Sequence, residues 1–97
     1  MKSVMIVFNQ SISEEINETL TSLNIRGYTK FLNVHGQGTD KGEPHLGTHI
    51  WPSQNIVLLT VIEDKLVDPL LERIREIEKE TEEQGLHAFV WNIEKIV

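Results

Sequence analysis

Short runs of apolar, β-branched residues alternate along the chain with segments whose apolar residues recur at helical spacing. The short runs predict four β-strands, and the first and third are apolar at almost every position. The second run mixes polar and apolar residues, so we expect that strand to be less buried. The predicted strands cover residues 3–8, 28–35, 55–62 and 87–93.

Two segments between these strands have apolar residues three or four positions apart, which is the spacing of one helix face. In the first segment, Ser11 lies three residues before Glu14, a capping-box pattern that predicts the start of a helix. In the second, Asp64 or Asp68 is the predicted N-cap, and Pro69 is placed in the first turn. The two apolar stripes are Ile12, Ile16, Leu20 and Leu23, and Val67, Leu70, Leu71, Ile74 and Ile77.

The order of these elements predicts an α+β, ferredoxin-like βαββαβ fold in a single domain that spans residues 1–97. Right-handed crossovers place both helices on one face of a four-stranded antiparallel sheet. A sheet with one solvated face normally alternates apolar and polar residues, whereas the first and third predicted strands are apolar on both faces. We therefore predict that a partner subunit covers the second face.

Composition and charge narrow the classes of function. The chain has 97 residues and no cysteine, which excludes disulfides, thiolate metal sites and cysteine nucleophiles. The net charge is −6, and nine acidic against four basic residues lie between Glu63 and Glu83, so nucleic acid is not an expected partner. No signal peptide and no apolar stretch of about 20 residues is found, so we expect a cytoplasmic protein without direct membrane insertion.

An enzyme is not expected. The sequence has no recognisable Ser-His-Asp arrangement and no paired carboxylates in a setting that would shift their pKa. The acidic residues of the second predicted helix are explained by a solvated outer face. Binding is therefore the class of function that remains.

Nineteen residues, Gly36 to Gln54, separate the second predicted strand from the third. Hairpin loops usually contain about two to five residues. Four of the six glycines, two of the three prolines and two of the four histidines lie in this segment, which we call the long loop. Loops of such length in compact domains are usually either functional or disordered, and we place the binding function here.

Three stretches of the sequence resemble the PII-like signal-transduction family. They are Gly-Tyr-Thr at 27–29, Asn-Val-His-Gly-Gln-Gly at 33–38 and Asp-Lys-Leu-Val-Asp at 64–68. The second stretch is similar to the start of the T-loop of those proteins, and with the βαββαβ order the resemblance covers nearly the whole chain. It implies a homotrimer, small-ligand sites between subunits at the T-loop base, and a loop that contacts a target protein such as a transporter or enzyme.

The chain departs from the PII pattern where a nucleotide would bind. PII proteins that bind ATP or ADP carry a glycine- and lysine-containing B-loop before the last strand, whereas residues 80–86 are acidic here. Their basic C-terminal segment has no counterpart, and the long loop has no tyrosine to modify. A nucleotide is therefore not the expected cofactor. The chain is similar to short PII-like proteins that are linked to heavy-metal efflux.

The base of the long loop is the predicted ligand-binding edge, formed by His35, Gly36, Gln37 and Gly38. The Gly-Gln-Gly turn could present backbone N–H groups to an anion, although turn geometry alone also explains two glycines. The assignment of a ligand to this turn follows mainly from the family resemblance.

A divalent metal site is the alternative use of the loop. His45 and His49 are four positions apart with Glu43 nearby, and on a helical turn the two imidazoles could share a transition metal. Pro44 and Gly47 oppose a helix there. The histidines could equally be ordinary polar loop residues.

Apolar loop residues are the predicted partner contacts, namely Leu46 and Trp51. The tryptophan either packs over the sheet edge or a neighbouring subunit, or is an exposed anchor for a partner protein. We assign Trp91 to the core or a subunit interface, and His87 to a structural role.

Three functions follow from these patterns. The first is a trimeric PII-like regulatory or sensor protein that binds a small ligand between subunits and contacts a target, such as a transporter or efflux component, through residues 36–54. The second is a metal-responsive binding protein related to metal efflux or CutA-type ion tolerance. The third is an assembly module without a ligand.

Overall fold

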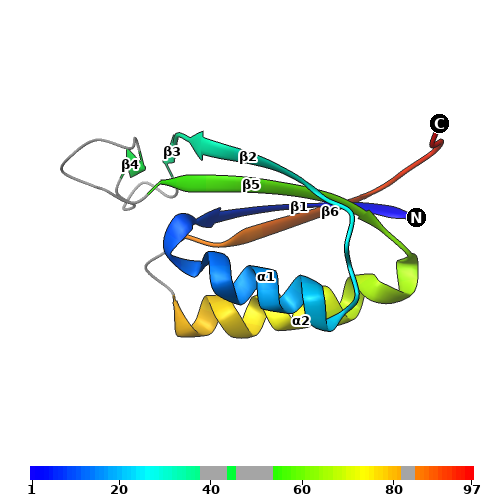
Figure 1. Cartoon of the computed structure of the whole chain (residues 1–97), viewed down its shortest axis with the longest axis horizontal. Helices are drawn as coiled ribbons and strands as arrows, with labels where there is room; N and C mark the ends of the chain where they lie inside the picture. Colours follow the sequence, from blue (N-terminus) through cyan, green and yellow to red (C-terminus); the bar gives the residue numbers. More distant parts are fainter. Residues whose placement is uncertain (38–43, 46–53, 82–84) are drawn as a thin grey trace.

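The computed structural model describes residues 1–37, 44–45, 54–81 and 85–97. Its main sheet has four strands in the order β2-β5-β1-β6, and every neighbouring pair is antiparallel. Both helices lie on the same face of this sheet (Figure 1). The predicted α+β, ferredoxin-like fold is therefore confirmed. The elements of this fold are β1 (Lys2–Asn9), α1 (Ser13–Ser22), β2 (Thr29–Val34), β5 (Asn55–Ile62), α2 (Asp64–Glu80) and β6 (His87–Asn92).

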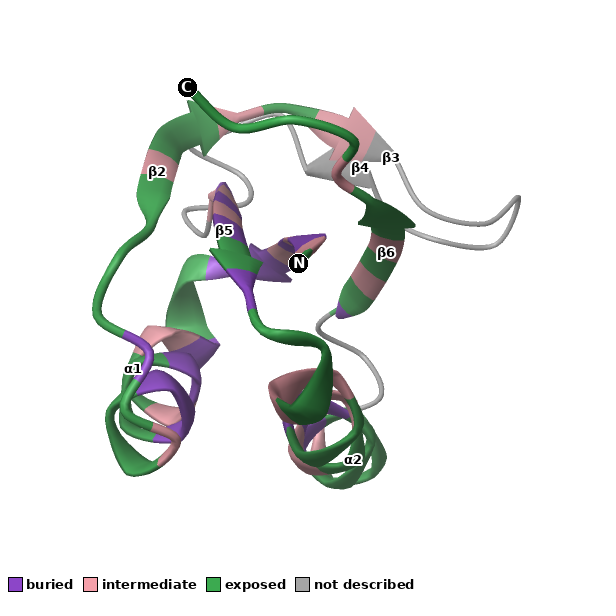
Figure 2. Ribbon diagram, turned by 90° about the vertical axis from the view of Figure 1, so that its right-hand side faces the viewer, coloured by how far each residue is buried: buried purple, intermediate pink, exposed green. Residues whose placement is uncertain are grey.

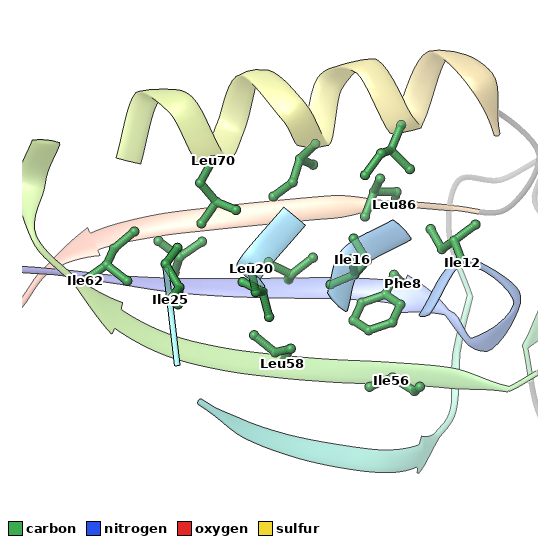
Figure 3. Close-up of a cluster of buried hydrophobic side chains, with 14 residues drawn as sticks. Phe8, Ile12, Ile16, Leu20, Ile25, Ile56, Leu58, Ile62, Leu70 and Leu86 are labelled. Atoms are coloured by element: carbon green, nitrogen blue, oxygen red, sulfur yellow. The ribbon is translucent and has the colours of Figure 1, made fainter. Parts of the chain in front are cut away.

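The core lies between the sheet and the two helices. In β1 the side chains of Val4, Ile6 and Phe8 have no exposed surface, because alternate residues of the strand all point toward the helices. Figure 3 shows how the side chains from both helices meet those from the strands. The buried cluster contains Val4, Ile6, Phe8, Ile12, Ile16, Leu20, Ile25, Ile56, Leu58, Ile62, Leu70, Ile74, Ile77 and Leu86.

The first helical segment begins earlier than the capping box predicts, although α1 itself begins only at Ser13, with Ile12 as its N-cap residue. A 3-10 turn, η1 (Gln10–Ile12), precedes α1, and its N-cap is Asn9, whose Oδ1 accepts a hydrogen bond from the Ser11 N–H at 2.9 Å. The prediction of Ser11 as the N-cap is therefore wrong. Asn9 takes this position because β1 ends there and the chain turns at once toward the helix layer.

The second helix also begins before the predicted cap. Glu63 is the N-cap residue, and its carbonyl oxygen accepts a hydrogen bond from the Leu66 N–H at 3.0 Å. Pro69 is consequently the sixth helical residue and lies in the second turn, not the first. Proline cannot donate the hydrogen bond expected at this position, and the packing of Leu70, Ile74 and Ile77 against the sheet compensates for its loss.

A buried hydroxyl joins the connection before β2 to the central strand β5. Thr60 is 2% exposed, and its Oγ1 donates a hydrogen bond to the Gly27 carbonyl oxygen at 2.6 Å. Buried hydroxyls are normally hydrogen-bonded, since an unpaired one is costly. This bond fixes the point at which the chain enters β2.

A β-bulge interrupts β2 shortly before the long loop. Phe31 pairs with Val57, but Val34 pairs with Asn55, so one extra residue lies on β2 between these pairs. Asn33 has a φ of 57°, in the left-handed region that asparagine tolerates better than most residues. Because of the bulge, Val34 lies on the same face of the sheet as Phe31, although the two residues are three positions apart.

A small ladder forms the base of the long loop. The strand β3 (Gly36–Gln37) pairs antiparallel with β4 (Pro44–His45), and Gly36 lies opposite His45. The hydrophobic pattern did not predict these two strands. These four residues form a separate two-stranded sheet near the end of β2 (Figure 1).

Candidate functional site

The face of the sheet that is turned away from the helices is apolar, and we call it the open face. Figure 2 views the sheet end-on, with both helices on the other side. Phe31, Phe89 and Trp91 on this face are 51%, 49% and 45% exposed. In the strand register these side chains flank a centre of half-buried apolar residues. The open face consists of Met5, Val7, Phe31, Val57, Leu59, Val61, Phe89 and Trp91.

Large apolar side chains on one continuous face are unusual for a sheet in contact with water. Single exposed apolar residues are ordinary, but here they form adjacent rows across four strands. The prediction that the first and third predicted strands, β1 and β5, are apolar on both faces is confirmed. The interface assignment of Trp91 fits its position on this face, and His87 is an exposed residue of the same face, with its ring 6.3 Å from that of Phe89.

The open face ends in polar residues where the long loop begins. Asn9 and Asn55 lie opposite each other at the ends of β1 and β5, and Val34 pairs with Asn55 on its other side. Both asparagines are buried, with exposed fractions of 2% and 9%. A Cβ atom built on Gly36 would lie 3.5 Å from the Asn55 Nδ2, so this amide borders the base of the loop.

The second end of the long loop is fastened to the start of the helix layer. The Gln10 N–H donates a hydrogen bond of 2.7 Å to the Gln54 carbonyl oxygen. Gln54 thus lies beside η1, and Asn55 enters the sheet next to it. Both ends of the loop are therefore held by backbone pairing, one through β2 and β3 and the other through β5.

The structure describes only some of the predicted site residues. His35 is exposed and follows β2 directly, and Gly36 and Gln37 form β3, so these three lie together at the base of the loop. The backbone of His45 pairs with Gly36 in β4. The remaining predicted ligand, metal and partner residues lie outside the described residues, namely Gly38, Glu43, Leu46, His49 and Trp51.

The described segments at the loop end of the sheet carry little formal charge. The described segments that meet there, 9–13, 34–37, 54–55 and 85–87, contain no lysine or arginine. Within the described ranges no group of three or more potential metal ligands is found. At the other end of the sheet, a hydrogen bond from the Met1 amino group at 3.0 Å lowers the pKa of the Asp64 carboxyl.

The sequence reasoning missed Asn9 and Asn55. Each is the polar residue at one end of a mostly apolar strand, the last of β1 and the first of β5. Their positions alone suggest ordinary strand ends. Only the antiparallel register, which places them opposite each other, shows that they form one polar pair.

These features define the class of the protein: an α+β, ferredoxin-like chain with a long loop at one end of its sheet. The model of the nitrogen regulatory protein P-II family matches residues 1–97, and the chain belongs to this family. Members of the family are regulatory proteins. No helix within the described ranges is both long and apolar enough to cross a membrane.

Solved structures of PII-like proteins have the same fold. CPII from Thiomonas intermedia, bound to ADP, AMP and bicarbonate, matches with a TM-score of 0.80 and 22% identity over 95% of this chain and 84% of CPII. A PII-like signalling protein from Thermus thermophilus matches with a TM-score of 0.66 and 24% identity, over 95% of this chain and 85% of the other. A comparison with curated proteins gave no match. The identities of the solved structures are low, so the likeness shows the shared fold.

Proposed function

We propose that this chain is the subunit of a homotrimeric, cytoplasmic regulatory protein, which binds a small ligand at the base of the long loop and contacts a target protein through that loop. One observation carries the proposal: the apolar open face ends directly at the loop base, in the row formed by Val34, Asn55 and Asn9. A subunit that covers the open face would therefore lie beside the ligand-binding edge.

The exposed aromatic residues of the open face support the assembly. About half of the surface of Phe31, Phe89 and Trp91 remains in contact with water in the single chain. Aromatic residues of this kind are enriched at the centres of protein interfaces. Proteins of the P-II family are typically trimers, and we assign the same number of subunits to this chain.

The base of the loop, His35 to Gly38, supplies the ligand-binding edge of the proposal. Gly36 has no side chain between its backbone and the Asn55 amide, so a ligand can approach the backbone closely. The described segments at this end lack lysine and arginine, and residues 80–83 are acidic. The described residues at this end would therefore offer no fixed positive charge to the triphosphate or diphosphate of a nucleotide, which favours a ligand of lower charge.

The outer part of the loop is the proposed contact with a target protein. Leu46 and Trp51 are the large apolar loop residues that we assign to this contact. A target in a transport or efflux system would recognise the loop in one ligand state and not in the other. In this proposal the protein regulates its target by binding and catalyses no reaction.

The proposal is tested by measuring the mass of the assembly and the rate at which trypsin cleaves the long loop. Size-exclusion chromatography with light scattering should give the mass of three subunits. Trypsin has one site in the loop, after Lys41, and cleavage there should become slower when a nucleotide, bicarbonate or a divalent metal binds. The variant Lys41→Gln, which removes the cleavage site, identifies the fragments.

Two results would contradict the proposal. A monomer at micromolar concentration would show that the open face is not a subunit contact. An unchanged rate of cleavage after Lys41 with every ligand, together with no thermal shift, would show that the loop does not respond to a small molecule and would favour an assembly module.

A further inference from the structure

One titratable side chain, that of His87, lies on the otherwise uncharged open face. The charged residues of the four strands of the main sheet are Lys2 and Lys30. Lys2 pairs with the core residue Ile62 at the end of the sheet, so it belongs to the helix side. The Lys30 ammonium group donates a hydrogen bond of 3.2 Å to the Asn17 Oδ1 on α1, which places it on the helix side as well. In the main sheet, therefore, only His87 can bring a charge to the open face.

His87 is one end of an apolar row that crosses the sheet. It lies opposite Val7 of β1, and Val7 lies opposite Val57 of β5. Phe31 of β2 completes the row by pairing with Val57. Among the described residues, the ring of His87 contacts the ring of Phe89 at 6.3 Å, and its nitrogens have no hydrogen-bond or ion-pair partner. In the single chain the side chain is exposed, so water can solvate its charged form.

A subunit that covers the open face would also cover this imidazole. Phe89 and Trp91 are the half-exposed aromatic residues of β6, and they follow His87 at alternate positions of the same strand. A neutral imidazole enters an apolar contact at modest cost, whereas a protonated imidazole without an anionic partner is costly to remove from water. The assembly would therefore distinguish the two charge states of His87.

The charged groups near the two ends of β6 lie away from the row of His87. Glu80 ends α2 in the helix layer, and Glu94 and Lys95 follow β6 at its other end. The acidic residues at 82–83 lie outside the described residues. Within the part of the chain that the structure describes, no carboxylate faces His87 from β1, β5 or β2.

We propose that His87 makes the assembly of this protein sensitive to pH: the open faces associate when its imidazole is neutral, and its protonation separates the subunits. This inference rests on the proposed function, since it names the residue that regulates the proposed subunit contact. Histidine is the side chain that ordinarily changes its charge between about pH 5 and 8. Free subunits bind a proton at His87 more readily than assembled ones, so assembly releases protons and weakens as the pH falls.

The size and the direction of the effect both follow from this proton release. A trimer releases up to three protons, so its dissociation constant rises by up to about 1,000-fold per pH unit, and the concentration of half-assembly by up to about 30-fold. The general charge of the chain predicts the opposite direction. Its net charge of −6 becomes less negative at lower pH, which reduces the repulsion between subunits and strengthens assembly.

The experiment follows the mass of the full-length protein by light scattering over a dilution series, at about pH 8 and about pH 5.5 and at constant ionic strength. The concentration of half-assembly of the wild type should be at least about tenfold higher at the lower pH. His87→Gln stays neutral and should not be weakened at the lower pH. His87→Lys is charged at both pH values and should assemble weakly at both.

A matched control moves the titratable group off the open face. The double variant His87→Gln/Thr21→His has as many histidines as the wild type, but the new one lies on the exposed side of α1. Its assembly should follow that of His87→Gln and not that of the wild type. Circular dichroism checks folding at both pH values, and His87→Thr, which is also neutral, replaces His87→Gln if that variant is unfolded.

Three results would overturn the inference: a wild type that assembles as tightly or more tightly at the lower pH, a neutral His87 variant that is weakened as much as the wild type, or a His87→Lys variant that assembles like the wild type at about pH 8. A protein that is trimeric at both pH values would keep the regulatory proposal and refute only the role of His87. A monomer at both pH values would refute the proposed function as well.

Discussion

Leu58 and Leu59 are adjacent on β5 but lie on opposite faces of the sheet, so lysine substitutions at the two positions separate folding from assembly. Leu58 has no exposed surface and packs in the core, whereas Leu59 is half-buried at the centre of the open face, between Met5 and Thr29. We expect Leu58→Lys to unfold the subunit, because a buried ammonium group has no partner in an apolar core. Leu59→Lys should leave the subunit folded and dissociate the proposed trimer.

The free energy available for assembly follows from the apolar surface that the open face still exposes. Each aromatic side chain can bury about 150–250 Å². Phe31, Phe89 and Trp91 are each about half exposed. Covering the rest would therefore remove roughly 225–375 Å² per subunit from water, or about 6–9 kcal/mol at about 25 cal/mol per Å². Association itself costs about 4–15 kcal/mol, so the net free energy of association is small. The cost of burying one lysine charge in the interface exceeds this net free energy.

The assay compares the two variants with the wild type by circular dichroism and by chromatography with light scattering. Thr21→Lys, on the exposed side of α1, introduces the same charge away from both faces of the sheet and should remain trimeric. The reasoning is refuted if Leu59→Lys assembles with the wild-type mass and affinity, or if it unfolds to the same extent as Leu58→Lys.

Two further predictions concern stability and the long loop. Thr60→Val removes the hydroxyl that donates a hydrogen bond to the Gly27 carbonyl oxygen, and it should lower the free energy of unfolding, measured by urea denaturation, by about 1–2 kcal/mol. Thr60→Ser keeps the hydroxyl and should retain most of the wild-type stability. Equal stability of the wild type and both variants would show that this hydrogen bond does not contribute. If the long loop binds a divalent metal, calorimetry should show that Zn²⁺, Cu²⁺ or Ni²⁺ binds the wild type more tightly than the double variant His45→Ala/His49→Ala. Identical weak binding by both proteins would refute the metal hypothesis.

The sequence predicted the elements of the fold well, because strand and helix periodicity is a local property. The run from Asn55 to Ile62 has the same limits in the pattern and in β5. The helix starts were less predictable, because a cap depends on backbone angles where a strand ends. For this reason Asn9 caps η1 and Ile12 is the N-cap residue of α1, in place of Ser11. Glu63 is the N-cap residue of α2, in place of Asp64 or Asp68.

The site was predictable only in part. The length of the segment from Gly36 to Gln54 identified the loop, since a hairpin does not need so many residues. The bulge at Asn33 and the small ladder between Gly36 and His45 depend on which residues pair across strands, and this pairing is not encoded in local spacing.

The sequence by itself determined that this protein has an α+β fold whose sheet is apolar on both faces, although its helices cover only one, and that a long loop lies between two of its strands. These properties follow from the order of apolar residues within each element. Only the tertiary structure decided that Asn9 and Asn55 meet at the end of that face and that their amides lie beside Gly36. Residues 46 positions apart become neighbours only through the antiparallel register of β1 and β5, which the fold as a whole fixes.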